Sequence, residues 1–209
     1  MSAPAPRTVV VPPERWARWV ENFTGSHGPA GWTVADGALL GEAEDGSTVT
    51  AHLPFDATYD GDPAPDRLAA AARAAVPDDW GVLLVRRGGF AVARLAGTEV
   101  GATKVGKRHV QGRTAAGGQS QQRFARRRAG QARVAFEAAA DHAVRLLGGL
   151  GPVVRGGDRG ALDAVLADPR LARVRPVGTF LEVGEPRRAV LDGAVADALG
   201  LSVVVVNAQ

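Results

Sequence analysis

The residues best suited to chemistry in this sequence are Gly117, Gly118 and Gln119, which stand just before a basic run, Arg123–Arg128. Glycine has no Cβ, so a Gly-Gly pair can take backbone conformations closed to other residues. The side chain of Gln119 is neutral and can both donate and accept hydrogen bonds. Such a tip suits chemistry in a crowded site, and the arginines beside it suit binding to a polyanion.

Positive charge is concentrated around this motif. Lys and Arg total 25 and Asp and Glu total 22, a net charge of +3. Residues 100–136 contain nine basic and no acidic residues, which leaves 16 basic and 22 acidic residues for the remainder. This asymmetry favours binding to phosphates, with release of their counterions. The alternative is an ordinary solvated face, and the exclusion of carboxylates over the whole segment argues against it.

A long helix is predicted to follow the motif, from about Ser120 to Leu147. Alanines and Phe136 recur at spacings of three and four on one face, and arginines lie on the opposite side. Cations near a helix N-terminus oppose its dipole, so their presence indicates an external anion. Residues 106–118 have no hydrophobic period, and we predict a mobile loop.

The other elements from Trp80 onward indicate a mixed sheet flanked by helices. Strands are predicted at 81–86, 90–95, 98–105, 152–155, 177–183 and 201–207, and further helices at 158–167 and from Pro186 to Gly200. Antiparallel hairpins followed by βα units are typical of such a sheet. The valine run in 201–207 suits a buried parallel strand.

The N-terminal part has its own αβ pattern. Strands are predicted at 7–11, within 32–40 and at 47–53, with a hairpin turn at Asp36-Gly37. Helices are predicted from Pro12-Pro13 onward and over 67–76. With a boundary near Pro77, we expect an N-terminal αβ extension, residues 1–78, packed on a catalytic core domain, residues 79–209. The predicted fold class is α/β (α+β).

Residues 117–120 (Gly-Gly-Gln-Ser), followed by 123–126 (Arg-Phe-Ala-Arg), closely resemble the central domain of eukaryotic and archaeal class I peptide-chain release factors. In that family the motif likewise precedes a long arginine-rich helix. The whole chain is similar to the bacterial (actinobacterial) Vms-like, release-factor-like peptidyl-tRNA hydrolases associated with rescue of stalled ribosomes. The specific match covers about residues 104–133. The strand order from Trp80 is compatible with the ribonuclease-H-like architecture of that domain.

The resemblance implies hydrolysis of the ester between a nascent peptide and tRNA. Gln119 would be catalytic: its backbone N–H would stabilise developing negative charge, and its side chain would position water. Gly118 and Gly117 would let the backbone approach the ribose. No protein base is evident, so the RNA, including the substrate's 2′-hydroxyl, would supply proton transfer. The expected phosphate contacts are Lys104, Lys107, Arg108, Arg113, Arg123, Arg126 and Arg127.

The expected partners are peptidyl-tRNA and the large ribosomal subunit with its rRNA. No codon-reading motif of the Asn-Ile-Lys-Ser type is present, so we expect release that does not depend on a stop codon. The alternative is a non-catalytic ribosome- or RNA-binding factor in which Gly-Gly-Gln is only a flexible tip.

Composition argues against other functions. Cysteine is absent, which excludes a disulfide framework, a thiolate metal site and a cysteine nucleophile. No two histidines have zinc-ligand spacing. A metal-dependent nuclease would need clustered carboxylates, and residues 81–95 contain none. We expect no metal and no cofactor. Without a signal peptide or membrane-spanning run, the expectation is a cytoplasmic monomer.

Overall fold

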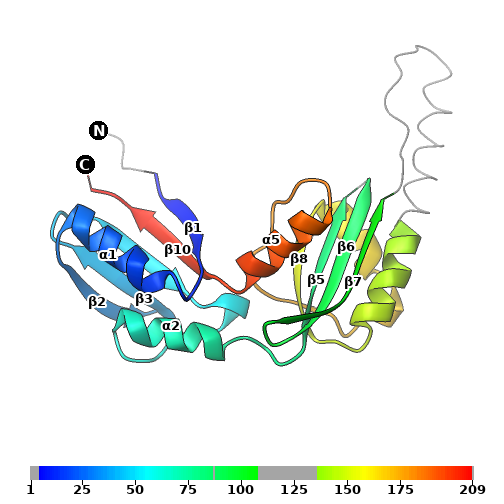
Figure 1. Ribbon diagram of the computed structural model, residues 1–209, viewed down its shortest axis with the longest axis horizontal. Helices are drawn as coiled ribbons and strands as arrows, with labels where there is room; N and C mark the ends of the chain where they lie inside the picture. The colour runs from blue at the N-terminus through cyan, green and yellow to red at the C-terminus, as the bar shows by residue number, and fades with distance from the viewer. Residues whose placement is uncertain (1–4, 87, 108–135, 209) are drawn as a thin grey trace, which may run out of the picture. The chain divides into compact units, whose positions relative to one another are not determined.

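The computed structural model describes residues 5–86, 88–107 and 136–208. They form two compact units, and Figure 1 shows a sheet in each. The first unit comprises residues up to Val76 together with those from Val195 onward, and the second comprises Pro77–Ala194. The division near Pro77 agrees with the sequence analysis. The assignment of all residues from 79 to 209 to one domain differs from the structure, because the last strand pairs within the first unit.

The first unit contains an antiparallel sheet with two helices. Its strands are β1 (Arg7–Val11), β2 (Ala30–Ala35), β3 (Ala38–Ala43), β4 (Thr48–His52) and β10 (Leu201–Val206), in the order β1-β10-β4-β3-β2. A 3-10 turn, η1 (Pro54–Asp56), and the helices α1 (Trp16–His27) and α2 (Pro65–Ala74) complete it. Positive φ angles at Asp36 (51°) and Gly37 (74°) confirm the predicted hairpin turn.

Strand β10 lies in a different place from the one that its sequence predicts. It pairs antiparallel with both β1 and β4, not parallel within the second sheet. Val203 and Leu201 are buried in the core of the first unit, and Val204 is only half-buried. A valine-rich run fits a central strand of either kind of sheet. Its partners are chosen by long-range topology, which the local pattern does not encode.

The second unit is built on a mixed sheet. Its strands are β5 (Trp80–Arg86), β6 (Gly89–Ala96), β7 (Glu99–Lys107), β8 (Pro152–Gly157) and β9 (Arg175–Pro176), in the order β7-β6-β5-β8-β9. The β5-β6-β7 meander is antiparallel, and β5, β8 and β9 are parallel neighbours. Residues 80–85 of β5 are all buried, as expected for a central strand covered on both faces. The predicted mixed sheet flanked by helices is therefore confirmed.

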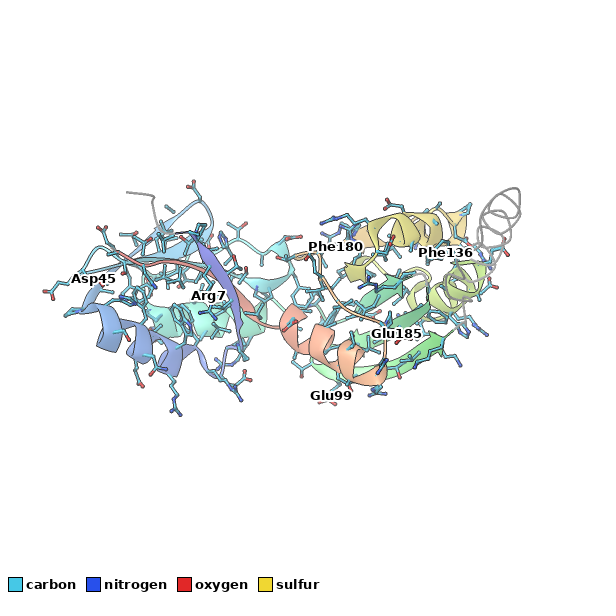
Figure 2. All side chains as sticks on the ribbon, turned by 90° about the horizontal axis from the view of Figure 1, so that it is seen from above. Arg7, Asp45, Glu99, Phe136, Phe180 and Glu185 are labelled. Atoms are coloured by element: carbon cyan, nitrogen blue, oxygen red, sulfur yellow. The ribbon has the colours of Figure 1, made fainter. Side chains whose placement is uncertain are left out.

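Helices cover both faces of this sheet. In Figure 2, α4 (Arg159–Leu166) and the part of α5 (Arg188–Ala198) that belongs to this unit lie on opposite sides of it. Helical residues 136–147 pack with α4 on one face, where Leu83, Val92 and Leu147 share a buried cluster. Asp158 caps the N-terminus of α4, because its Oδ1 accepts the Ala161 N–H at 2.9 Å. A 3-10 turn, η2 (Pro169–Leu171), follows α4.

One predicted helix start and one predicted strand are wrong. Helix α1 begins at Trp16, because Pro12 starts a turn in which its carbonyl accepts the Arg15 N–H. The strand expected at 177–183 is absent among these described residues: only a single bridge, Gly156 to Leu181, forms there. Gly178 has a φ of +68°, which interrupts an extended strand.

Candidate functional site

Only two of the predicted site residues lie in the described part of the chain. Lys104 and Lys107 are exposed on the last residues of β7. The predicted catalytic residues Gly117, Gly118 and Gln119 lie outside the described residues. The same holds for the predicted RNA contacts Arg108, Arg113, Arg123, Arg126 and Arg127. The roles of all ten residues stay predictions.

The described residues on either side of this segment line one open pocket of about 290 Å³, here called the arm-base pocket. Lys107 is the last described residue before the segment and Phe136, labelled in Figure 2, is the first after it; both line the pocket. Arg86 and Lys104 add two more exposed cations, and Phe90 adds an aromatic wall. The segment that carries the Gly-Gly-Gln motif thus starts and ends at a cationic pocket.

Two glycines at this end of the β5-β6-β7 meander allow its close packing. A Cβ on Gly106 would collide with the ring of Phe90, and a Cβ on Gly89 would lie 2.7 Å from the Gly106 carbonyl oxygen. Both positions therefore need glycine. As a result, the ring of Phe90 packs against Gly106 of β7, and Phe90 is only 8% exposed.

His142 forms part of the pocket wall. Its ring stacks on Phe90 with centroids 5.2 Å apart, and Arg145 Nη2 donates to His142 Nδ1 at 2.7 Å. Burial lowers the pKa of His142, and the positive charges of Arg145 and Lys104 lower it further. The imidazole is therefore neutral at neutral pH, which agrees with an Nδ1 that accepts a hydrogen bond.

Few acidic groups offset the cations of the pocket. Glu185 Oε1 lies 3.9 Å from Lys107 Nζ, but both side chains are exposed and Glu185 also pairs with Arg187 at 2.8 Å. Such a contact contributes little. A cationic rim beside aromatic rings can bind a phosphate together with a base. Within residues 5–86, 88–107 and 136–208, no three His, Asp or Glu residues gather closely enough to hold a metal ion.

Sequence reasoning missed Arg86 and His142 as pocket residues. A usable signal existed for Arg86, since it ends a strand that must pair with the start of the next one, Gly89, in a tight hairpin. No such signal existed for His142, because its approach to Phe90 depends on how the helix packs on the sheet.

A serine, a histidine and a carboxylate also meet in the first unit. Asp45 Oδ2 lies 2.8 Å and Ser47 Oγ 3.1 Å from His27, and both contact the same ring atom, Nδ1. A nucleophilic triad needs the two ring nitrogens to contact different partners. Ser47 is fully buried and its Oγ accepts the Ala208 N–H at 2.8 Å. The cluster therefore anchors the C-terminal residues and does no chemistry.

Comparisons with known proteins bear on the family. A family described as the Actinobacteria/chloroflexi VLRF1 release factor matches residues 78–204. Among solved structures, the Vms1 mitochondrial localization core aligns over 90% of this chain and 81% of its own, at 12% identity and a TM-score of 0.41. An archaeal translation termination factor, aRF1, aligns over 95% and 68%, at 13% identity and a TM-score of 0.39. Curated protein sequences gave no match.

The fold and the arm-base pocket define a mixed α+β protein with a cationic surface at both ends of its basic segment. The family match spans more than half of the chain, and the chain belongs to the Actinobacteria/chloroflexi VLRF1 release factor family. Its role is accordingly release-factor-like and associated with the ribosome. Among the described residues, no helix has the length and apolar character needed to cross a membrane.

Proposed function

We propose that this protein hydrolyses the ester that joins a nascent peptide to tRNA on the large ribosomal subunit, without a stop codon. The observation that carries the proposal is the family match over residues 78–204, a range that includes Gly117, Gly118 and Gln119 and every predicted RNA contact. The arm-base pocket supports it, because Lys104 and Lys107 lie on β7, the strand from which the segment departs, and Arg86 lies on the neighbouring β5-β6 hairpin.

The proposed reaction is an ester hydrolysis. Water adds to the ester carbonyl carbon, the bond from that carbon to the ribose oxygen breaks, and the ribose oxygen takes up a proton. The Gln119 backbone N–H donates to the oxygen on which negative charge develops. The Gln119 side chain orients the water, and the glycines admit the backbone to the ribose. Proton transfer passes through the RNA, including the 2′-hydroxyl of the substrate.

The decisive experiment measures peptide release from purified large subunits that carry peptidyl-tRNA and no mRNA. Gln119→Ala removes the amide that orients water, so release should fall by about 100-fold or more while binding to the subunit persists. The sequence offers a matched control in Gln122→Ala, three residues further on, which should release peptide at the wild-type rate. Equal release by Gln119→Ala and wild type would refute the catalytic role. Binding without any release by the wild type would favour the non-catalytic alternative.

A second experiment maps the bound surface. Lys104 and Lys107 are the only lysines of the chain, so an amine-acetylating reagent modifies only these two side chains and the N-terminus. Both are exposed in the free protein. We expect large subunits to protect Lys104 and Lys107 and to leave the N-terminus reactive. Unchanged acetylation of both lysines in the complex would contradict contact at the arm-base pocket.

A further inference from the structure

A second pocket, of about 430 Å³, lies where the parallel strands β5 and β8 end. We call it the carboxyl-end pocket. The side chains of Arg86, Arg159, Phe180 and Glu182 line it, together with the backbone near Gly157 and Gly184. The carboxyl ends of parallel strands are a common place for ligands in such sheets. All of these residues belong to the second unit and lie within its described part.

The segment over residues 180–184, which forms one wall of this pocket, is fixed to the strand ends. The Leu181 N–H donates to the Arg155 carbonyl at 2.9 Å, and the Gly157 N–H donates to the Leu181 carbonyl at 3.0 Å. Gly157 has a φ of +107°, and a Cβ there would collide with the Val85 carbonyl oxygen. Glycine at this position therefore allows the wall to form.

Neutral groups hold both arginines of the pocket in place. Arg86 Nη1 donates to the Val183 carbonyl at 2.7 Å, and the Arg159 guanidinium lies over the Phe180 ring, 4.0 Å from its centroid. Phe180 is labelled in Figure 2, on the connection between β9 and α5. A carbonyl and an aromatic ring orient a guanidinium without neutralising its charge. Each arginine keeps further N–H donors for a ligand.

Four other exposed arginines of the second unit, Arg94, Arg170, Arg187 and Arg188, are paired with acids. The ion pairs are Arg94–Asp79, Arg170–Asp168, Arg170–Asp141, Arg187–Glu185 and Arg188–Asp192. In the described part of the chain, neither Arg86 nor Arg159 forms such a pair with a carboxylate. Glu182 lines the same pocket, so the charged side chains of the carboxyl-end pocket carry a net charge of +1. The two arginines are therefore oriented but not neutralised, which is the arrangement expected of an anion site.

Arg86 lines both pockets, so the carboxyl-end pocket is a neighbour of the arm-base pocket. Lys104, Lys107 and Arg86 line the arm-base pocket, and Arg86 and Arg159 line the carboxyl-end pocket. A phosphate fits two guanidinium groups well, and an unstacked base can stack on an arginine plane that is itself backed by an aromatic ring. An acidic peptide would use the charge but not the stacked plane.

We propose that the carboxyl-end pocket binds a nucleotide of single-stranded RNA, with its phosphate on Arg86 and Arg159 and its base against the Arg159–Phe180 stack. The proposal rests on the proposed function in taking RNA as the partner. It adds a contact outside the basic segment of residues 100–136. The pocket thereby directs an RNA strand past the point where that segment joins the sheet.

The test measures binding of a fluorescent single-stranded RNA of about 12 nucleotides to the full-length protein over a range of salt concentrations. Arg159→Gln should weaken binding by about fivefold or more and reduce the slope of log K against log salt by about 0.7, since one phosphate contact is lost. Arg159→Lys keeps the charge but loses the planar stack, so it should retain the slope and lose affinity. Glu182→Gln removes a repulsive charge and should tighten binding.

Arg173→Gln is the matched control, because Arg173 is an exposed arginine of the same unit that lines neither pocket. It should leave the affinity unchanged. Hydrogen exchange of the second unit verifies that every variant is folded. An Arg159→Gln variant that binds as well as Arg173→Gln, or weaker binding by Glu182→Gln, would overturn the proposal.

Two further measurements are made. The first distinguishes RNA from a free nucleotide or phosphate as the ligand, and the second tests the proposed hydrolysis separately from the proposed RNA site. AMP and inorganic phosphate compete with the labelled RNA; competition by AMP at concentrations as low as those of unlabelled RNA would assign the pocket to a free nucleotide and overturn the RNA proposal. Peptide release is measured on the same preparations. If the wild type releases peptide and Arg159→Gln binds RNA as well as the wild type does, this inference is refuted and the proposed hydrolysis is not. Arg159-dependent binding without release would refute the proposed hydrolysis alone.

Discussion

Helical residues 136–147 pack on the sheet, and a double-mutant cycle can test one close approach between them. Leu147 is fully buried at the end of helical residues 136–147. A Cβ on Gly81 of β5 would collide with Leu147 Cδ2 and would lie 3.2 Å from Leu150 Cδ2. The missing side chain at Gly81 is therefore the space that the leucine fills.

The magnitudes follow from this geometry. Leu147→Ala should cost about 3–4 kcal/mol, because the sheet backbone at Gly81 cannot move in to fill the cavity. Gly81→Ala should cost about 2 kcal/mol through overpacking against the leucine. In the double variant the new methyl group occupies part of the vacated volume. We expect it to be less destabilised than the two single costs together by about 1–2 kcal/mol.

Hydrogen exchange of the full-length chain, followed by mass spectrometry, is the suitable assay, because the two units need not unfold together. Peptides from β5 and β6 report the opening free energy of the second unit. Peptides from α1 report the first unit, and all three variants should leave their exchange unchanged. If the destabilisation of the double variant equals the sum of the two single destabilisations to within about 0.5 kcal/mol, the reasoning is refuted. The Leu147 side chain and the methyl group added at Gly81 would then not occupy the same space.

Two predictions concern titration. Hydrogen bonds from the Arg170 side chain, and secondarily from its backbone N–H, hold the pKa of Asp168 at about 2. The contribution of this carboxylate to the stability of the fold is therefore complete above the usual aspartate pKa and should disappear as pH falls from about 4 to 2. A carboxyl NMR titration with an ordinary midpoint for Asp168 would contradict this. The folded pKa of His142 lies below that of the unfolded chain, so protonation destabilises the fold and this contribution to stability is lost as pH falls below about 6.5. Arg145→Ala should raise the His142 pKa in an imidazole NMR titration, and an unchanged or lower value would show that Arg145 does not act on it.

The sequence predicted much of the second unit because its local signals agree with one another. An uninterrupted apolar run marks β5, the Gly88-Gly89 pair marks the hairpin, and Asp158 marks the start of α4. Predictions failed where long-range contacts decide the outcome. The wall at residues 180–184 has the composition of a strand, yet its conformation depends on Gly178 and on hydrogen bonds to β8.

For the candidate site, the sequence identified which residues carry charge and chemistry, and it placed Lys104 and Lys107 near the end of a strand. It could not place Arg86 and His142 beside them, because those neighbours come from a different strand and from a helix. The carboxyl-end pocket lay further still beyond sequence reasoning. Arg159 and Phe180 are separated by twenty-one positions, and only their packing shows that an aromatic ring holds the guanidinium.

The amino-acid sequence by itself determined the chemical character of this protein, which is a Gly-Gly-Gln motif in a segment of nine cations and no acids. Apolar runs in the sequence also predicted most strands of the neighbouring sheet. These are local properties, set by residue type and spacing. The tertiary structure alone decided that β10 joins the first unit and that Lys107 and Phe136 line one pocket. It also decided that two arginines, held by a carbonyl and an aromatic ring, flank the ends of β5 and β8. The physical reason is that strand pairing and helix packing bring together residues far apart in the chain, and many partners satisfy the same local pattern.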